Sequence, residues 1–385
     1  IYMKNNDYYR ELHLIVKRQL TEEENKNYSL NQVKETTNRI LLNPLFKHIK
    51  KEEFPLDEFC EDLLKRLTIE VEESSILEDN DDHIDWYKSN VKRPFWDSHR
   101  SWLIEIKNRP IEVINSIDRS TDDLIKRLED PKRQGVWDRR GLVVGSVLSG
   151  KTGHFIALIN KAYDAGYKKI VLLSGMTNEL RKQTHIRIDQ GVIGENTSAY
   201  GVSENIEGTN LPLKKNYRDN KNYKIFPYTT SDINGDYKLH RQSIMTDTRM
   251  ILCIKKNKSI LEQTIKLFER DLEEDEPILV IDDEVDQASV DTGFQNFNEE
   301  NEPDPEYDPK TINKLIRKLL YIHKKKCFIG YTATPMANIL SHEGAKTDEH
   351  GPDLFPRNFI IDLGEPSNYF GFEKVFAENE DGSTT

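Results

Sequence analysis

Two patterns of apolar and polar positions divide the chain. Over residues 1–130 the apolar positions recur at spacings of three and four within mixed-charge stretches such as EFCEDLLKRLTIEVEESSILE, which is typical of amphipathic helices. From Gly141 onward the apolar residues instead gather into short runs: GLVVG, KIVLLSG, MILCIKK, PILVIDDE, CFIGYTATP and NFIIDL. Short apolar runs bounded by Gly, Asp or Lys are typical of buried parallel strands.

The alternation of these strands with helical segments predicts an α/β fold with a doubly wound, mostly parallel sheet. We therefore expect a mainly helical N-terminal domain over 1–130 and an α/β domain over 131–375. Stretches rich in Asn, Gly and Pro near 192–245 and 296–310 are expected to form polar insertions in the second domain. Residues 376–385 are expected to be a linker or the start of a further C-terminal region.

Composition excludes several classes of protein. No run of about 18 apolar residues occurs, so no membrane-spanning helix and no membrane partner are expected. The three cysteines, Cys60, Cys253 and Cys327, lie far apart, which argues against a disulfide scaffold and favours a cytoplasmic protein. The 55 basic and 67 acidic residues give a net charge of −12, so a nucleic acid would need a local basic groove.

The clearest chemical signal is a glycine-rich loop, GSVLSGKT, between a predicted strand and a predicted helix. It is a complete G-x-x-x-x-G-K-[ST] pattern in the context that phosphate binding requires. In such a loop, backbone N–H groups surround phosphate oxygens, the lysine reaches the β- and γ-phosphates, and the threonine hydroxyl ligates Mg²⁺. We expect ATP and Mg²⁺ to bind here. The residues expected at the ATP are Gly145, Ser149, Gly150, Lys151, Thr152 and Gly153, with Thr152 also on the metal.

A second signal is the strand ILVI followed by the acidic sequence DDEVD. Parallel strands deliver such residues to the sheet edge at which ligands bind. Asp283 is expected to hold Mg²⁺ through water, and Glu284 is expected to orient or deprotonate the attacking water. Spacing alone leaves Asp282 and Asp283 both open as the magnesium residue, and the D-E-x-D match of 283–286 favours Asp283. Together with Lys151, Asp283 and Glu284 form the expected catalytic set.

Three further segments carry weaker signals. GYTATP follows the strand CFI and resembles motif III of superfamily 2 helicases, which implies that Thr332 and Thr334 couple nucleotide state to movement between lobes. The segment LLSGMTNELRKQTHIRID resembles motif Ia, which contacts the nucleic-acid backbone; a solvated helix face is the alternative. A basic pair before the first strand, Arg139 and Arg140, is a candidate for the adenine or ribose. The residues expected to contact nucleic acid are Asn178, Arg181, Gln183, Thr184, Arg187, Lys255, Lys256 and Asn257.

Taken together, RRGLVVGSVLSGKT, CIKKN, LVIDDEVDQASVDT, GYTATPMANIL and DLFPRNFIIDLGEPSNYFG resemble the Z-one domain family over roughly residues 110–375. These are large bacterial proteins described as endonucleases or helicase-like ATPases and encoded beside restriction, methylation and other phage-defence components. The resemblance implies a RecA-like P-loop NTPase lobe of the superfamily 2 type that hydrolyses ATP and acts on DNA. It further implies a role in anti-phage defence or restriction–modification, with a nuclease or methylase as partner.

Two alternative functions stay open. A nucleotide-dependent switch or scaffold that binds partner defence proteins would fit the helical N-terminal region and the acidic charge. A nuclease within these residues is less supported, because no segment pairs an Asp with a convincing strand that carries E-x-K or D-x-K. A possible metal cluster in SHEGAKTDEHGPD, formed by His342, Glu343, Asp348, Glu349 and His350, lies in a stretch with Gly and Pro that a solvated loop explains.

Overall fold

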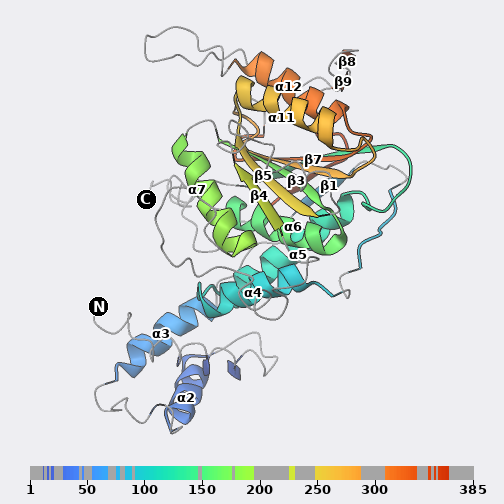
Figure 1. Ribbon diagram of the computed structural model, residues 1–385. Helices are drawn as coiled ribbons and strands as arrows, with labels where there is room; N and C mark the ends of the chain where they lie inside the picture. Colours follow the sequence, from blue (N-terminus) through green and yellow to red (C-terminus); the bar gives the residue numbers. More distant parts are fainter. Residues whose placement is uncertain are drawn as a thin grey trace, which may run out of the picture. The chain divides into compact units, whose positions relative to one another are not determined.

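Figure 1 shows the computed structural model of the chain, which groups into two compact units. One unit comprises Ile1–Glu72, Arg100–Ser116 and Glu365–Thr385, and the other comprises Glu73–His99 and Ile117–Gly364. The domain boundaries expected near residues 130 and 375 stay predictions. The residues that the structure describes are 12, 15–16, 19–20, 29–42, 46, 54–67, 75–78, 83–88, 92–145, 150–175, 178–194, 225–229, 248–287, 308–335, 346–347, 351–352 and 354–363.

An eight-stranded sheet forms the centre of the second unit, in the order β1-β10-β2-β7-β6-β3-β5-β4. Every neighbouring pair is parallel except β1 with β10. The predicted α/β class with a mostly parallel sheet is therefore confirmed. The strands are β1 (Ser75–Glu78), β2 (Trp137–Val144), β3 (Lys169–Ser174), β4 (Ile225–Thr229), β5 (Arg249–Lys255), β6 (Ile278–Asp283), β7 (Lys325–Thr332) and β10 (Phe359–Asp362), with a separate pair β8 (Lys346–Thr347) and β9 (Gly351–Pro352).

The strand order places three chemically interesting segments side by side. After β2 the chain crosses to β3 and β5, then returns to β6 and β7, so that β7 lies between β2 and β6. Parallel strands share one carboxyl edge, and open α/β sheets bind ligands there. The segments that follow β2, β7 and β6 therefore meet at one edge of the sheet.

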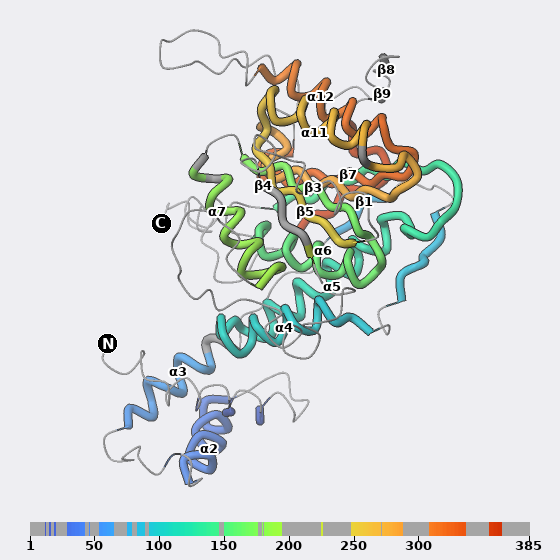
Figure 2. Tube along the Cα trace, in the orientation of Figure 1, coloured from blue at the N-terminus to red at the C-terminus, as the bar shows by residue number. Residues whose placement is uncertain are grey.

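Helices cover both faces of the sheet (Figures 1 and 2). In β3, Ile170 and Leu172 pack into the core beneath α5 and α6, whereas Val171 and Leu173 pack into the core beneath α11 and α12. This alternation, with both sides apolar, explains why the strands read as continuous apolar runs. The helices of this unit are α5 (Ile111–Arg127, in part), α6 (Lys151–Ala165), α7 (Asn178–Ile188), α11 (Lys258–Asp271) and α12 (Pro309–Tyr321), and the π-helical turn η2 (Asp189–Ile193) follows α7.

Local sequence explains where these helices begin and end. The side chains of Asn257 and Asp308 accept hydrogen bonds from backbone N–H groups in the first turns of α11 and α12, and Pro309 opens α12. Gly166 ends α6 with a φ of 110°, which is a left-handed conformation that glycine adopts without strain. No helix in the described part of the chain is long and apolar enough to cross a membrane.

The expectation of helices over 1–130 is wrong at one described segment. Ser75–Glu78, at the end of a stretch in which the spacing predicts a helix, forms the edge strand β1. Ile76 packs on the sheet core while the next residue, Leu77, is 69% exposed, as expected of neighbours that point to opposite faces of a strand. The other unit contains α2 (Leu30–Leu41) and α3 (Leu56–Leu67), which share an apolar core of their own. Helix α4 spans Pro94–Glu105.

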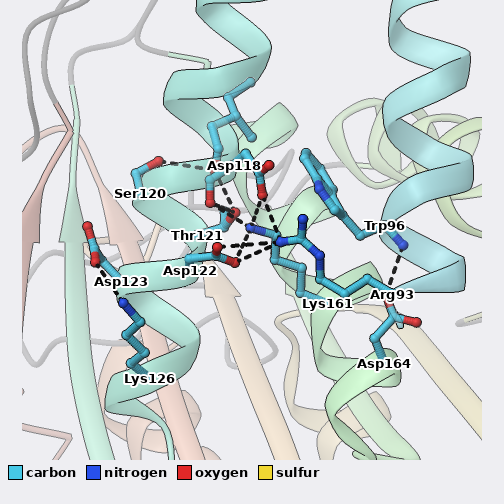
Figure 3. Close-up of polar contacts among 11 residues, drawn as sticks. Arg93, Trp96, Asp118, Ser120, Thr121, Asp122, Asp123, Lys126, Lys161 and Asp164 are labelled. Carbon is cyan, nitrogen blue, oxygen red and sulfur yellow. Dashed lines mark hydrogen bonds and ion pairs between the residues drawn. The ribbon is translucent and has the colours of Figure 1, made fainter. Parts of the chain in front are cut away.

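A cluster of charges joins α5 to α6 beneath the sheet (Figure 3). The fully buried Lys161 ammonium donates to Asp118 Oδ1 at 2.6 Å and to Asp122 Oδ1 at 2.5 Å. Arg93 reaches the same two carboxylates at 3.2 and 3.4 Å, and the Trp96 ring centroid lies 4.7 Å from the ammonium. Burial lowers the pKa of Lys161, and the two carboxylates act in the opposite direction. The cluster thus fixes the helix whose first turn follows the glycine-rich loop.

We expect Lys161→Met to lower the free energy of unfolding by about 3 kcal/mol, because it leaves two neighbouring carboxylates with Arg93 alone. Urea denaturation would measure this loss. Lys126→Met is the control: its ion pair with Asp123 is 3.8 Å long and about one-third exposed on both sides, so the loss should stay below about 1 kcal/mol. Equal losses in the two variants would show that the buried cluster adds no stability.

Candidate functional site

The carboxyl ends of β2, β7 and β6 are joined by backbone hydrogen bonds. Gly145 N–H donates to the Thr332 carbonyl at 3.0 Å, and Val285 N–H donates to the Tyr331 carbonyl at 2.9 Å. The first bond connects the start of the glycine-rich loop to the T-A-T-P segment. The second connects the acidic turn to the same segment. All three sequence signals therefore lie at one edge of the sheet.

The glycine-rich loop ends on an uncapped helix. As predicted, strand β2 precedes the loop and α6 begins at Lys151. Gly150 has a φ of 79°, in the left-handed region that favours glycine, and no side chain caps the first turn of α6. Backbone N–H groups at such a helix start attract anions, and phosphate above all. Ser149 lies outside the described residues, whereas Gly145, Gly150, Thr152 and Gly153 lie within them.

Lys151 is half-buried and bonds to the residue at the start of the glycine-rich loop. Its Nζ donates to the Gly145 carbonyl at 2.8 Å. Burial lowers its pKa, while Asp283, Asp286 and Glu284 act in the opposite direction, so all three carboxylates lie within electrostatic reach of the ammonium. A carbonyl is a weak partner for a half-buried cation, and a phosphate oxygen in the same loop would be a stronger one.

The two adjacent aspartates at the end of β6 have different roles. Asp282 is fully buried and pairs with the buried ammonium of Lys256 at 2.9 Å. Lys256 also donates to the carbonyls of Asp283 at 3.0 Å and Glu284 at 2.7 Å. Asp282 is therefore engaged in an internal ion pair, which leaves Asp283 as the better candidate for a metal. Lys256 itself is buried, so its expected contact with nucleic acid is wrong.

Asp283 and Glu284 form a strained, electronegative turn. Burial, and next the charge of Glu284, raise the pKa of Asp283 to about 6. Glu284 has a φ of 57°, a conformation that costs a non-glycine residue roughly 1–3 kcal/mol and that clusters at functional sites. Its Oε2 atom is buried and has no hydrogen-bond partner among the described residues. A cation and an ordered water would relieve this arrangement.

Both threonines of the T-A-T-P segment bind one carboxylate. Thr332 Oγ1 donates to Asp286 Oδ1 at 2.7 Å, and Thr334 Oγ1 donates to Asp286 Oδ2 at 2.7 Å. The Thr334 amide N–H in turn donates to Thr332 Oγ1 at 2.9 Å. The structure thus ties the T-A-T-P segment to the acidic turn. Asp286 was not among the predicted site residues, although the last letter of the D-E-x-D match marks it.

A buried histidine–tyrosine pair lies beneath the loop. His154 Nδ1 is 2.9 Å from the Tyr331 hydroxyl, and both side chains are buried. Burial, and next Lys161, lower the pKa of His154 to about 3, so the ring is neutral. The pair joins the first turn of α6 to the last residues of β7. Nothing in the local sequence around His154 or Tyr331 predicts it, since the two residues are far apart in the chain.

The predicted nucleic-acid residues separate into different environments. Arg187 NH1 donates to Thr152 Oγ1 at 2.9 Å, which brings it to the glycine-rich loop. Arg181 is half-buried on the same helix, and Lys255 ends β5 opposite Ser174 of β3. The structure does not describe the side chain of Asn178. The contact of these residues with nucleic acid stays a prediction.

The three remaining residues predicted to contact nucleic acid lie in different surroundings. Thr184 is buried, and Gln183 is exposed. Asn257 caps α11 by accepting a hydrogen bond from the amide N–H of Ile260 at 3.1 Å.

Of two weaker predictions, the adenine or ribose contact is wrong and the metal cluster lies outside the described residues. Arg140 is buried and paired with Asp138, and Arg139 donates to the Arg127 carbonyl, so neither reaches the loop edge for an adenine or ribose. The side chains of the possible metal cluster over 342–350 lie outside the described residues. Among the described residues, no group of three or more His, Cys, Asp or Glu side chains could hold a metal by itself. Mg²⁺ needs no such group, because one or two carboxylates, phosphate oxygens and waters suffice.

Comparisons with known proteins give a fold-level likeness at most. No protein-family model matches the chain, and no curated protein matches it. Two structures of the DUF1998 helicase MrfA, one bound to DNA and one to DNA and AMPPNP, are 12% and 11% identical. They cover 69% and 76% of this chain at TM-scores of 0.33 and 0.35. This chain spans only 29% and 34% of theirs.

A third structure, chloroplast FtsY from Physcomitrella patens, is 13% identical and covers 71% of this chain and 70% of its own, with a TM-score of 0.19. A TM-score below 0.5 does not establish a common fold. The function proposed below therefore depends on the residues of this chain and not on these likenesses.

We expect Lys256→Met to lower the free energy of unfolding by about 3–5 kcal/mol, because it leaves the Asp282 carboxylate buried and unpaired. Urea denaturation would measure the loss, and adding Asp282→Asn to the variant should restore part of it. Lys255→Met, one residue earlier and half-exposed, is the control and should cost less than about 1 kcal/mol. A loss of similar size in both single variants would contradict the role given to Lys256.

Proposed function

We propose that this chain binds Mg·ATP at the carboxyl edge of its sheet and hydrolyses it, as a RecA-like lobe of the superfamily 2 type. The observation that carries the proposal is that Lys151, at the uncapped start of helix α6, lies within electrostatic reach of Asp283, Glu284 and Asp286, at the sheet edge where backbone hydrogen bonds join Gly145 and Val285 to β7. On one side lie the Lys151 ammonium and the N-terminus of α6, which attracts anions. On the other side lie the three carboxylates. That arrangement suits a phosphate chain with a divalent cation between the two sides.

Each residue has a distinct task in this proposal. Lys151 exchanges the Gly145 carbonyl for phosphate oxygens, while N–H groups of the first turn of α6 hold the same phosphates. The Thr152 hydroxyl and Asp283 would hold Mg²⁺, which neutralises charge that develops on the transferred phosphoryl group. Glu284, with its unpartnered buried oxygen, orients the attacking water and accepts its proton. Asp282 takes no part in the reaction, because Lys256 neutralises it.

Asp286 extends the nucleotide site to the T-A-T-P segment. Because Thr332 and Thr334 both donate to its carboxylate, a shift of the acidic turn on nucleotide binding or hydrolysis would move the end of β7 as well. The backbone bond from Gly145 to Thr332 gives a second connection to the same strand. This is the physical form of the coupling that the sequence resemblance implies. Coupling of this kind is useful to a motor and to a switch.

Action on DNA is the finer part of the proposal. It depends on the resemblance of the motifs and on two basic residues, Arg181 and Lys255, which lie on α7 and at the end of the neighbouring strand β5. The solved helicase structures named above contain DNA, but their likeness to this chain carries no weight. The alternative is a nucleotide-dependent switch for partner proteins. A motor's ATP turnover rises when DNA is added, whereas a switch is indifferent to it. A role in phage defence, with a nuclease or methylase partner, follows from the family resemblance alone.

Lys151→Ala should weaken Mg·ATP binding by about tenfold or more, because a charge-assisted contact to phosphate contributes roughly 1.5–3 kcal/mol. Isothermal titration calorimetry would measure the affinity, and circular dichroism would check folding. Lys182→Ala removes an exposed lysine of α7 and should bind ATP like the parent. An unchanged affinity in the Lys151 variant would disprove the nucleotide site.

Glu284→Gln should keep ATP binding and lower ATP turnover by roughly 10²-fold or more, since an amide cannot accept the proton of the attacking water. A phosphate-release assay with Mg²⁺ would measure the rate. Glu179→Gln changes an exposed glutamate of α7 and serves as the control. If the Glu284 variant turned over ATP at the parent rate while Asp282 or Asp283 variants were inactive, the roles within the acidic turn would be assigned wrongly.

A further inference from the structure

One arginine outside the glycine-rich loop contacts the residue expected to hold the metal. Arg187, in the last turn of α7, donates from NH1 to Thr152 Oγ1 at 2.9 Å. Its side chain is exposed, so its charge is available at the surface of the site. The threonine hydroxyl keeps a second lone pair and its proton for other partners. A guanidinium therefore already lies beside the position at which phosphates and Mg²⁺ are proposed to bind.

Packing fixes Arg187 relative to the loop. Helix α7 continues into the π-helical turn η2, and such turns often occur at functional sites. Asn160 of α6 donates from Nδ2 to the Gly191 carbonyl at 2.9 Å. A Cβ atom on Gly191 would lie 2.7 Å from Ile156 Cγ2, so only glycine allows η2 to lie this close to α6. Arg187 thus precedes a turn that packs on α6, the helix to which Thr152 belongs.

The charge of the site favours a second cation when nucleotide binds. Lys151 is set against Asp283, Glu284 and Asp286, so the carboxylates outnumber it before any phosphate arrives. Mg²⁺ on Thr152 would repel the guanidinium from the hydroxyl, while the terminal phosphate beside it would attract the same group. An arginine suits this role because its planar group can bind two phosphate oxygens at once.

We propose that Arg187 is a nucleotide-binding residue that leaves Thr152 for the γ-phosphate of Mg·ATP. This inference rests on the ATP site proposed above. The contact would give the chain a cation of its own at the terminal phosphate, and it would make the position of α7 depend on whether that phosphate is present. Arg181, six residues earlier on α7, would not share this role.

The test compares the affinities of the full chain for Mg·ATPγS and Mg·ADP by calorimetry. Arg187→Ala should weaken Mg·ATPγS binding by about tenfold and Mg·ADP binding by less than about threefold, because only the former has a γ-phosphate. Arg187→Lys should lose less of the Mg·ATPγS affinity, since it keeps the charge without the bidentate group. Lys182→Ala removes an exposed cation of the same helix, so it is the control and should bind both nucleotides like the parent. Thermal unfolding of each variant checks that the fold is kept.

The outcomes separate this inference from the proposed function. A parent chain that binds neither nucleotide overturns the ATP site itself. If the parent binds and Arg187→Ala has unchanged, tighter or equally weakened affinities for the two nucleotides, the γ-phosphate contact is wrong. If Arg187→Ala keeps its nucleotide affinities but lowers the salt slope of DNA binding by about one unit, Arg187 is a DNA-backbone contact and the inference is overturned.

Discussion

The acidic turn after β6 depends on one buried ammonium. Lys256 satisfies the Asp282 carboxylate and the carbonyls of Asp283 and Glu284 together, so a single group holds three consecutive residues at the end of the strand. It helps to hold the left-handed conformation of Glu284, together with the bond from Val285 N–H to the Tyr331 carbonyl. The same turn carries Asp283 and Glu284, whose charges act on Lys151, so this interaction also supports the electrostatics of the site.

The position of β7 between β2 and β6 is the second constraint. Because β7 pairs with both neighbours, its last residues contact both the start of the glycine-rich loop and the acidic turn. The Thr332 carbonyl accepts a hydrogen bond from Gly145 N–H, and the Thr332 hydroxyl donates to Asp286. The Tyr331 hydroxyl is hydrogen-bonded to His154. The T-A-T-P segment thus contacts both the glycine-rich loop and the acidic turn, which is the position that the proposed coupling requires.

Much of this arrangement could be predicted from the sequence, because local patterns carry it. The apolar runs gave the central strands, and the loop pattern gave the start of α6 at Lys151. β2 extends four residues further back than its apolar run, since buried charges such as Arg140 find partners that no local pattern shows. The ion pair of Lys256 with Asp282 and the bond of Arg187 to Thr152 were not predicted, because a basic residue's partner in space cannot be read from its neighbours in the chain.

A crystal structure of the chain with AMPPNP and Mg²⁺ tests the central claim most directly. The account predicts phosphates on the first turn of α6, Lys151 moved from the Gly145 carbonyl to a phosphate oxygen, and the metal near Thr152 and Asp283. Asp282 should still be paired with Lys256. Nucleotide bound elsewhere with Lys151 still on the Gly145 carbonyl, or a metal held by Asp282, would contradict the account.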